Sequence, residues 1–143
     1  GINSQVYYVS MGGFDTHVNQ SKRQDKLLNV YAESMDVFIK DLEKSNTFKD
    51  TLVLTFSEFG RRVKQNAANG TDHGAANNVF IIGKNLSKPG FYNEAPNLLD
   101  LDKNNDLKYT VDFRSIYATV LKKWLEVNDG QVLNKSFKTL DFI

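Results

Sequence analysis

The chain has 143 residues, of which 41% are hydrophobic and 24% charged, so it is long enough to bury the core of one globular domain. Its formal net charge of +1 gives no reason to expect a nucleic acid or an anionic membrane as a partner. No apolar run is long enough to span a bilayer, and the absence of cysteine excludes disulfides and thiol chemistry.

The first half of the chain predicts a strand, a helix and a second strand. Residues 5–11 (QVYYVSM) are rich in β-branched and aromatic side chains, which favours a buried strand. Residues 22–44 carry apolar side chains at helical spacing, which predicts an amphipathic helix that ends near Asn46, a suitable C-terminal cap. Residues 51–56 (TLVLTF) form an apolar run typical of a parallel strand, and residues 65–70 (QNAANG) indicate a loop. The three elements together predict a right-handed βαβ unit.

The second half predicts a third strand, an irregular excursion and a second helix. Residues 78–83 (NVFIIG) favour a strand, whereas residues 84–105 hold both prolines and little periodicity, which indicates a surface excursion. Residues 107–111 (LKYTV) predict a short strand. Asp112 is a good N-cap for an amphipathic helix over residues 113–127.

The two histidines of the chain each lie in a glycine-framed loop beside a predicted strand. His17 lies in GGFDTH, two positions after Asp15, so both side chains point to the same side of an extended or turning segment. His73 lies in GTDHG, directly after Asp72. Histidine and aspartate are good ligands for divalent metals, and glycines let the backbone approach an ion closely. We therefore expect Asp15, His17 and His73 to bind a divalent cation, with Asp72 holding the ring of His73 or serving as a second ligand.

Each histidine loop also has a structural interpretation. Asp15 can cap a turn while His17 is an ordinary surface or core residue, and the TDHG segment can be a simple turn. Asp112 and Arg114 are expected to be structural, as a helix cap and a charge early in a helix. The aromatic side chains are expected to lie in the core.

The segment SEFGRR follows the predicted strand at residues 51–56, at the end where ligands bind in open α/β sheets. The carboxylate of Glu58 is a candidate metal ligand or catalytic base. Arg61 is a candidate for stabilising an oxyanion such as phosphate or sulfate, because a guanidinium matches that geometry. The alternatives are that Glu58 and Arg61 pair at helical spacing, or that Arg61 and Arg62 are solvated.

Four motifs in this order, GGFDTH, SEFGRR, GTDHG and TVDFRSIYATVLKKWL, resemble the C-terminal part of the bacterial family named domain of unknown function 1501. The resemblance implies a branch of the alkaline phosphatase-like superfamily, which also contains sulfatases. It implies a single α/β domain over residues 1–143, with a mostly parallel sheet flanked by helices and metals at the strand ends. Asp15, His17 and His73 match the first metal site of that superfamily in order. Glu58 stands where an Asp-His pair usually binds a second metal.

The resemblance implies a metal-dependent hydrolase of phosphate or sulfate esters, with zinc, manganese or calcium as the metal and a small anionic ester as the substrate. Its nucleophile would belong to a missing N-terminal half, because family members are much longer and usually carry an export signal for the periplasm or the cell exterior. We therefore expect the chain to be an inactive C-terminal fragment that can self-associate through an exposed sheet edge. The alternative is a non-catalytic envelope protein that keeps the fold and binds a glycan or a protein.

Overall fold

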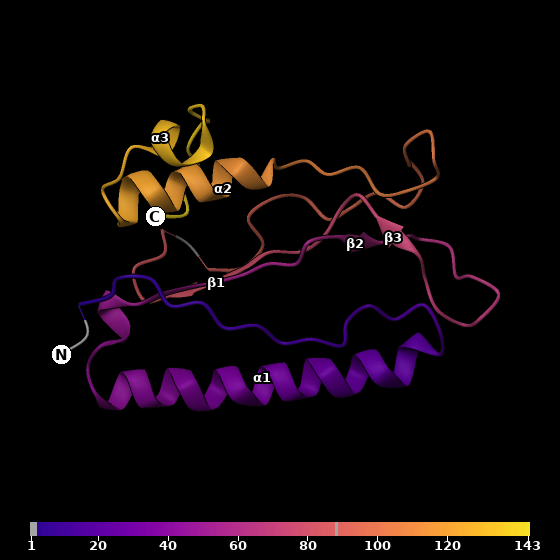
Figure 1. Cartoon of the computed structure of the whole chain (residues 1–143), viewed down its shortest axis with the longest axis horizontal. Helices are drawn as coiled ribbons and strands as arrows, with labels where there is room; N and C mark the ends of the chain where they lie inside the picture. The colour runs from indigo at the N-terminus through magenta and orange to yellow at the C-terminus, as the bar shows by residue number, and fades with distance from the viewer. Residues whose placement is uncertain (1–2, 88) are drawn as a thin grey trace. The chain divides into compact units, whose positions relative to one another are not determined.

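The computed structural model describes residues 3–87 and 89–143, which form two compact units (Figure 1). Unit 1 contains the described residues of Gly1–Met11, Asn85–Glu94 and Thr110–Ile143. Unit 2 contains Gly12–Lys84 and Ala95–Tyr109. Both histidine loops belong to unit 2, so the candidate site can be described within one unit.

The long helix predicted over residues 22–44 is confirmed as α1 (Gln20–Lys44) of unit 2 (Figure 1). It ends close to the predicted position. Asn46 has a φ of 57°, the left-handed conformation that asparagine tolerates just beyond a helix C-terminus. The short 3-10 turn η1 (Phe48–Asp50) follows and leads into the first strand.

The main sheet of unit 2 is an antiparallel pair in which β1 (Leu52–Thr55) lies beside β4 (Phe80–Gly83). Its Cα partners are Leu52 with Gly83, Val53 with Ile82, Leu54 with Ile81 and Thr55 with Phe80. Helix α1 packs on this pair through Tyr31. The Tyr31 hydroxyl lies 2.9 Å from the Thr55 hydroxyl, and the ring centroids of Tyr31 and Phe80 are 6.2 Å apart.

The prediction of a mostly parallel sheet flanked by helices, as in an alkaline phosphatase-like fold, is wrong. In the described residues the sheets are two antiparallel pairs, β1 with β4 and β2 (Gly60–Arg61) with β3 (His73–Gly74). Residues 5–11 join neither pair, and Val9 is 90% exposed. An apolar run does not specify strand direction, and β propensity produces a strand only beside a suitable partner.

The predicted strand at residues 107–111 is also wrong, because a hydrogen-bonded turn organises the preceding segment. One carboxylate oxygen of Asp102 accepts the backbone N–H groups of Asn104 and Asp106 at 2.8 and 2.9 Å. Arg62 donates from Nε to the Asp106 carboxylate at 3.2 Å and also donates to the Asn104 carbonyl. Such side-chain to backbone bonds compete with strand pairing and fix this turn against Arg62.

Acid should destabilise the protein partly through Asp102. The backbone N–H groups of Asp106 and Asn104 stabilise the carboxylate, which lowers the pKa of Asp102 below its ordinary value of 3.8. Its stabilising effect is therefore fully present above that ordinary value and is lost as the pH falls through the lower pKa of the folded protein. The Asp102→Asn variant keeps an oxygen acceptor but no charge. Thermal melts between about pH 5 and about pH 3 should show a smaller acid-induced loss of stability in this variant; an equal loss would contradict the assignment.

The second predicted helix begins as expected in unit 1, but its last turn is π-helical instead of α-helical. It forms α2 (Phe113–Thr119) and continues as the π-helical turn η2 (Val120–Trp124), so it is shorter than the predicted range 113–127. Asp112 is confirmed as the N-cap, because its carboxylate accepts the backbone N–H of Arg114 at 2.9 Å. It also pairs with the Arg114 guanidinium at 2.7 Å, so both residues have a structural contact at the helix start.

Unit 1 is held together by a small apolar core and a buried ion pair. Its buried apolar side chains, among the described residues, are Ile116, Ala118 and Phe142. Asp129, the first residue of α3 (Asp129–Leu133), is fully buried. Its carboxylate lies 2.9 Å from Lys122 Nζ and accepts the backbone N–H of Phe137 at 2.9 Å. Because a buried charge needs such partners, these contacts fix α3 in place.

Candidate metal centre

His17 lies in the loop before α1, and this loop is fastened to a second loop, residues 66–72. The backbone N–H groups of Asn19 and Gln20 donate to carbonyls of the second loop at 3.0 and 2.9 Å. The side-chain amide of Asn66 donates to the His17 carbonyl at 3.0 Å. The N–H groups of Asn19 and Gln20 at the start of α1 are thus satisfied by the second loop, which fixes His17 beside it.

Gly70 allows the two loops to approach each other this closely. A Cβ atom at Gly70 would lie 2.2 Å from the backbone carbonyl atoms of His17. Asn66 shapes the loop around the glycine, because its side-chain oxygen accepts the backbone N–H groups of Ala68 and Gly70 at 2.9 and 3.0 Å. A larger residue at position 70 would force the loops apart.

His73 is placed by the short ladder of β2 and β3. In this antiparallel pair Gly60 is the partner of Gly74, and Arg61 is the partner of His73. A Cβ atom at Gly60 would lie 1.7 Å from the Ala76 carbonyl oxygen, and one at Gly74 would lie 2.7 Å from the Arg61 carbonyl. The two glycines therefore allow close backbone contact and hold the register that sets His73 opposite Arg61.

The two loops bring one carboxylate and two imidazoles together. Asp15 Oδ1 lies 2.9 Å from His17 Nε2 and 3.0 Å from His73 Nε2, and the two Nε2 atoms are 3.2 Å apart. Among the described residues, these three form the group whose ligand atoms lie close enough to hold one metal ion. We call them the Asp-His-His cluster. Its side chains are about half exposed, so a ligand can reach it from solvent.

The donor spacing of the Asp-His-His cluster suits a divalent cation. An ion with bonds of about 2.1 Å separates neighbouring ligands by ~3.4 Å in a tetrahedron and ~3.0 Å in an octahedron. The observed separations of 2.9, 3.0 and 3.2 Å are closer to one face of an octahedron. Two imidazoles and one carboxylate suit zinc, manganese or ferrous iron better than calcium, which prefers oxygen ligands. The residues present therefore fit such an ion.

Asp72 orients His17, whereas the sequence hypothesis paired it with His73. Its carboxylate lies 3.1 Å from His17 Nδ1 and also accepts from the Asn66 amide at 3.3 Å. The hydrogen bond from His17, with that from Asn66, lowers the pKa of Asp72 below its ordinary value. A neutral His17 that donates its Nδ1 proton to this carboxylate would have its lone pair on Nε2, the atom that a metal ligand requires.

Arg61 holds the carboxylate of the cluster in place. Its guanidinium donates to Asp15 Oδ1 at 3.0 Å, to the Thr71 carbonyl at 2.8 Å and to the Phe14 carbonyl. The hydrogen bond from His73, supported by nearby positive charge, lowers the pKa of the Asp15 carboxyl below its ordinary value. Arg61 therefore ties both histidine loops together and pairs with Asp15, not with Glu58.

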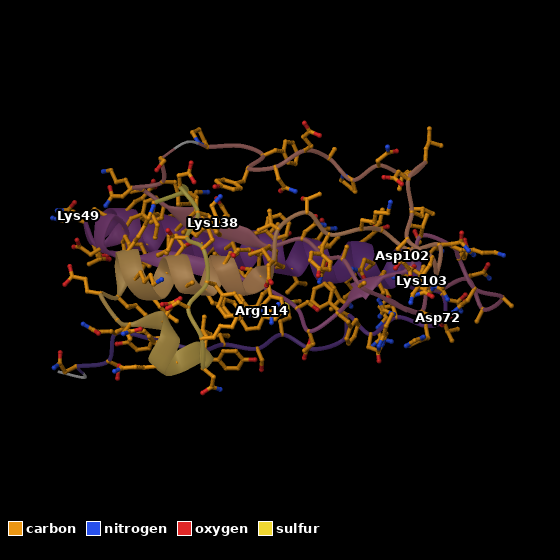
Figure 2. All side chains as sticks on the ribbon, turned by 90° about the horizontal axis from the view of Figure 1, so that it is seen from above. Lys49, Asp72, Asp102, Lys103, Arg114 and Lys138 are labelled. Atoms are coloured by element: carbon orange, nitrogen blue, oxygen red, sulfur yellow. The ribbon has the colours of Figure 1, made fainter. Side chains whose placement is uncertain are left out.

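Glu58 lies outside the Asp-His-His cluster, and its side chain is exposed. Arg62, the other arginine of the motif, connects Asp72 to the turn around Asp102. Its backbone N–H donates to the Asp72 carbonyl at 3.0 Å, while its side chain binds the 102–106 turn. Asp72 and Asp102 accordingly lie toward the same end of unit 2 in Figure 2.

Two residues that shape the cluster were missed in the sequence. The sequence predicts a loop at residues 65–70 with no role for Asn66, and it predicts that the aromatic residues lie in the core. Phe59 instead stacks on the His73 ring, with centroids 3.7 Å apart and planes 10° apart. A usable signal was present, because Phe59 and Arg61 are two positions apart beside a strand and so share a face. Asparagine side chains also typically bond the backbone two residues further on, as Asn66 does at Ala68.

Replacing Asp72 with asparagine should weaken cation binding by about 10- to 100-fold. The asparagine amide can donate to His17 Nδ1, which moves the ring proton to Nε2 and removes the lone pair that binds the ion. Calorimetric titration with zinc and manganese measures the affinity. The matched control is Asp36→Asn, which neutralises an exposed carboxylate paired with Lys40 on α1. Equal affinities of Asp72→Asn and the unchanged protein would show that Asp72 does not select the tautomer.

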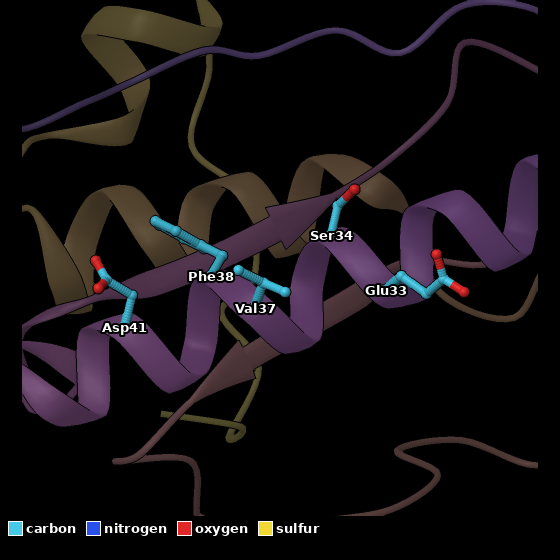
Figure 3. A pocket seen from close by; sticks show the side chains of 5 residues that line it. All are labelled: Glu33, Ser34, Val37, Phe38 and Asp41. Carbon is cyan, nitrogen blue, oxygen red and sulfur yellow. The ribbon is translucent and has the colours of Figure 1, made fainter.

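A separate hollow lies on the surface of α1 (Figure 3). Its lining residues are Glu33, Ser34, Val37, Phe38 and Asp41. All five come from the same helix, and none belongs to the Asp-His-His cluster. The hollow is open and offers carboxylates without an imidazole, so it does not compete with the cluster as the candidate site.

Comparison with known proteins identifies the family. A search of curated proteins and a search of solved structures each found no match. Among the described residues, no helix has the length and apolarity that crossing a membrane requires. The family model described as "Protein of unknown function (DUF1501)" matches residues 3–137, which is nearly the whole chain. The chain therefore belongs to the DUF1501 family.

Proposed function

We propose that this chain forms the metal-binding part of a metal-dependent hydrolase of phosphate or sulfate esters. The observation that carries the proposal is the convergence of Asp15 Oδ1, His17 Nε2 and His73 Nε2 within 3.2 Å of one another. A divalent cation held there would polarise an ester oxygen and offset its developing negative charge. The four motifs resemble the DUF1501 family, and the kinship with phosphatases and sulfatases that this resemblance implies suggests the reaction class by analogy alone.

Each residue has a distinct role in this proposal. Asp15, His17 and His73 hold the ion, and Asp72 keeps His17 in the tautomer that binds it. Arg61 fixes Asp15, and its positive charge beside the ion favours an anionic substrate. This proposal assigns the nucleophile to none of the described residues. A role of Glu58 as a base or as a second metal ligand stays a prediction. Lower turnover in the Glu58→Gln variant would support this role.

Hydrolysis of an aryl phosphate and an aryl sulfate tests the proposal. Turnover is measured with zinc, manganese or ferrous iron and with a chelator, for this chain and for the longest natural form of the protein. We expect metal-dependent turnover by the long form, little by this chain, and loss of turnover in His17→Ala. Turnover that survives both the chelator and His17→Ala would overturn the proposal, as would the absence of turnover with every metal.

A non-catalytic protein of the cell envelope is the second candidate function. It is favoured by the position of Glu58 outside the cluster and by the use of Arg61 donors for Phe14, Asp15 and Thr71. The first feature leaves, among the described residues, a site for one ion only. The second means that the Arg61 donors are used within the protein instead of binding an anion. This candidate predicts glycan or protein binding that survives chelation and His73→Ala. A metal requirement for that binding would count against it.

A further inference from the structure

The two imidazoles of the Asp-His-His cluster are held in different ways. His17 is held at Nδ1 by the Asp72 carboxylate at 3.1 Å. His73 is instead held on its face by Phe59, whose ring is nearly parallel to the imidazole at 3.7 Å between centroids. We propose that Phe59 is a positioning residue that fixes the ring of His73 and directs its Nε2 toward Asp15 and His17.

The β2–β3 ladder explains why Phe59 reaches His73. Phe59 directly precedes β2, and it shares a strand face with Arg61 two positions later. Arg61 is the cross-strand partner of His73, so Phe59 is the diagonal neighbour of His73. Diagonal neighbours in an antiparallel pair are within reach of aromatic side chains. The stack is thus a consequence of the register that Gly60 and Gly74 allow.

Phe59 is itself anchored, as a positioning residue requires. Its carbonyl accepts the side-chain amide of Asn77 at 2.8 Å and the hydroxyl of Ser57 at 3.2 Å. The guanidinium carbon of Arg61 lies 5.2 Å from the centre of its ring, within cation–π range. Since Arg61 also holds Asp15, one connected set of contacts fixes both the carboxylate and the second imidazole.

The orientation of His73 matters because Nε2 is the ring atom that faces the other two donors. It lies 3.0 Å from Asp15 Oδ1 and 3.2 Å from His17 Nε2, so a turn of the ring would remove it from the cluster. Residues that orient metal ligands typically change metal affinity by 10- to 100-fold when they are removed. This consequence rests on the proposed metal site, whereas the ring orientation does not.

Nuclear magnetic resonance tests the orientation without any metal. The ring centroids of His17 and His73 are 5.0 Å apart, so the imidazole protons should show mutual Overhauser effects. Phe59→Leu should weaken these effects and move the His73 ring protons downfield, because the stacked ring is gone. Phe59→Tyr should preserve both signals. If Phe59→Leu does not fold, Phe59→Val takes its place. The control is Phe91→Leu, the same exchange on a ring that is 97% exposed.

Calorimetric titration with zinc and manganese then measures the consequence. We expect about tenfold weaker binding in Phe59→Leu and unchanged binding in Phe59→Tyr and in Phe91→Leu. Unchanged Overhauser effects between the imidazoles in Phe59→Leu would overturn the positioning role. If the unchanged protein binds metal, an equal metal affinity of Phe59→Leu would overturn it as well. If the unchanged protein binds no metal while Phe59→Leu still loses the imidazole contacts, the proposed function fails and the positioning role stands.

Discussion

Replacing His73 with alanine should lower the affinity for zinc or manganese by more than about 100-fold, a larger loss than removal of an orienting neighbour causes. The reason is geometric, because His73 Nε2 is one of three donors whose separations are 2.9, 3.0 and 3.2 Å. In His73→Ala only two of the three donors would remain, and water would fill most of the coordination positions of the cation. His17→Ala should have an equal effect. Calorimetric titration of the unchanged chain and both variants measures this loss.

The thermal stability of the same variants separates a metal site from a structural contact. His73 is about half exposed, so removal of its ring should change the melting temperature little when no metal is added. Asp36→Ala is the control, because it deletes an exposed carboxylate on α1 that is paired with Lys40 and lies outside the Asp-His-His cluster. A large loss of stability with unchanged metal affinity would contradict the account and would assign His17 and His73 a purely structural role.

Gly70→Ala should destabilise the protein by about 3 kcal/mol, because the new methyl group cannot be accommodated. A Cβ atom at this position would lie 2.2 Å from the backbone carbonyl atoms of His17, and both are main-chain atoms that cannot turn aside. The loops would separate, which would move Asp72 away from His17. Urea denaturation measures the free energy of unfolding, and the titration described for His73 measures the accompanying loss of metal affinity.

Gly12→Ala is the matched control for this prediction. A Cβ atom at Gly12 would meet no atom within 4 Å, so we expect a change in stability within about 0.5 kcal/mol. Both substitutions add one methyl group to a glycine of a histidine loop, and they differ in the space available. Equal stabilities of Gly70→Ala and Gly12→Ala would show that the contact between the loops is not as close as the structure has it.

The helices of this fold could be predicted because their signals are local. The apolar spacing along residues 22–44 and the capping side chain of Asp112 both depend on neighbours a few positions away. The relative direction of two paired strands is not determined by such local signals. Residues 51–56 form a similar apolar run whichever way their partner runs, and the structure pairs β1 with β4 in the antiparallel sense. Residues 5–11 have high β propensity but lie outside both strand pairs of the described residues.

The residue types of the candidate site could be predicted from the sequence, but the contacts between its side chains could not. Aspartate and histidine in two glycine-framed loops indicate metal chemistry, and the structure places Asp15, His17 and His73 together. Which carboxylate orients which imidazole depends on the docking of two loops, as in the contact between Asp72 and His17, which are 55 positions apart in the sequence. The stack of Phe59 depends on strand register, which local patterns do not encode.

The central claim is that Asp15, His17 and His73 bind one divalent cation. The most direct test is a zinc titration of this chain, followed through the imidazole nitrogen shifts of both histidines. The account predicts saturation at one ion per chain, with Nε2 of both rings coordinated and Nδ1 of His17 still protonated toward Asp72. Coordination through His17 Nδ1, or zinc binding that leaves either imidazole unchanged, would contradict it.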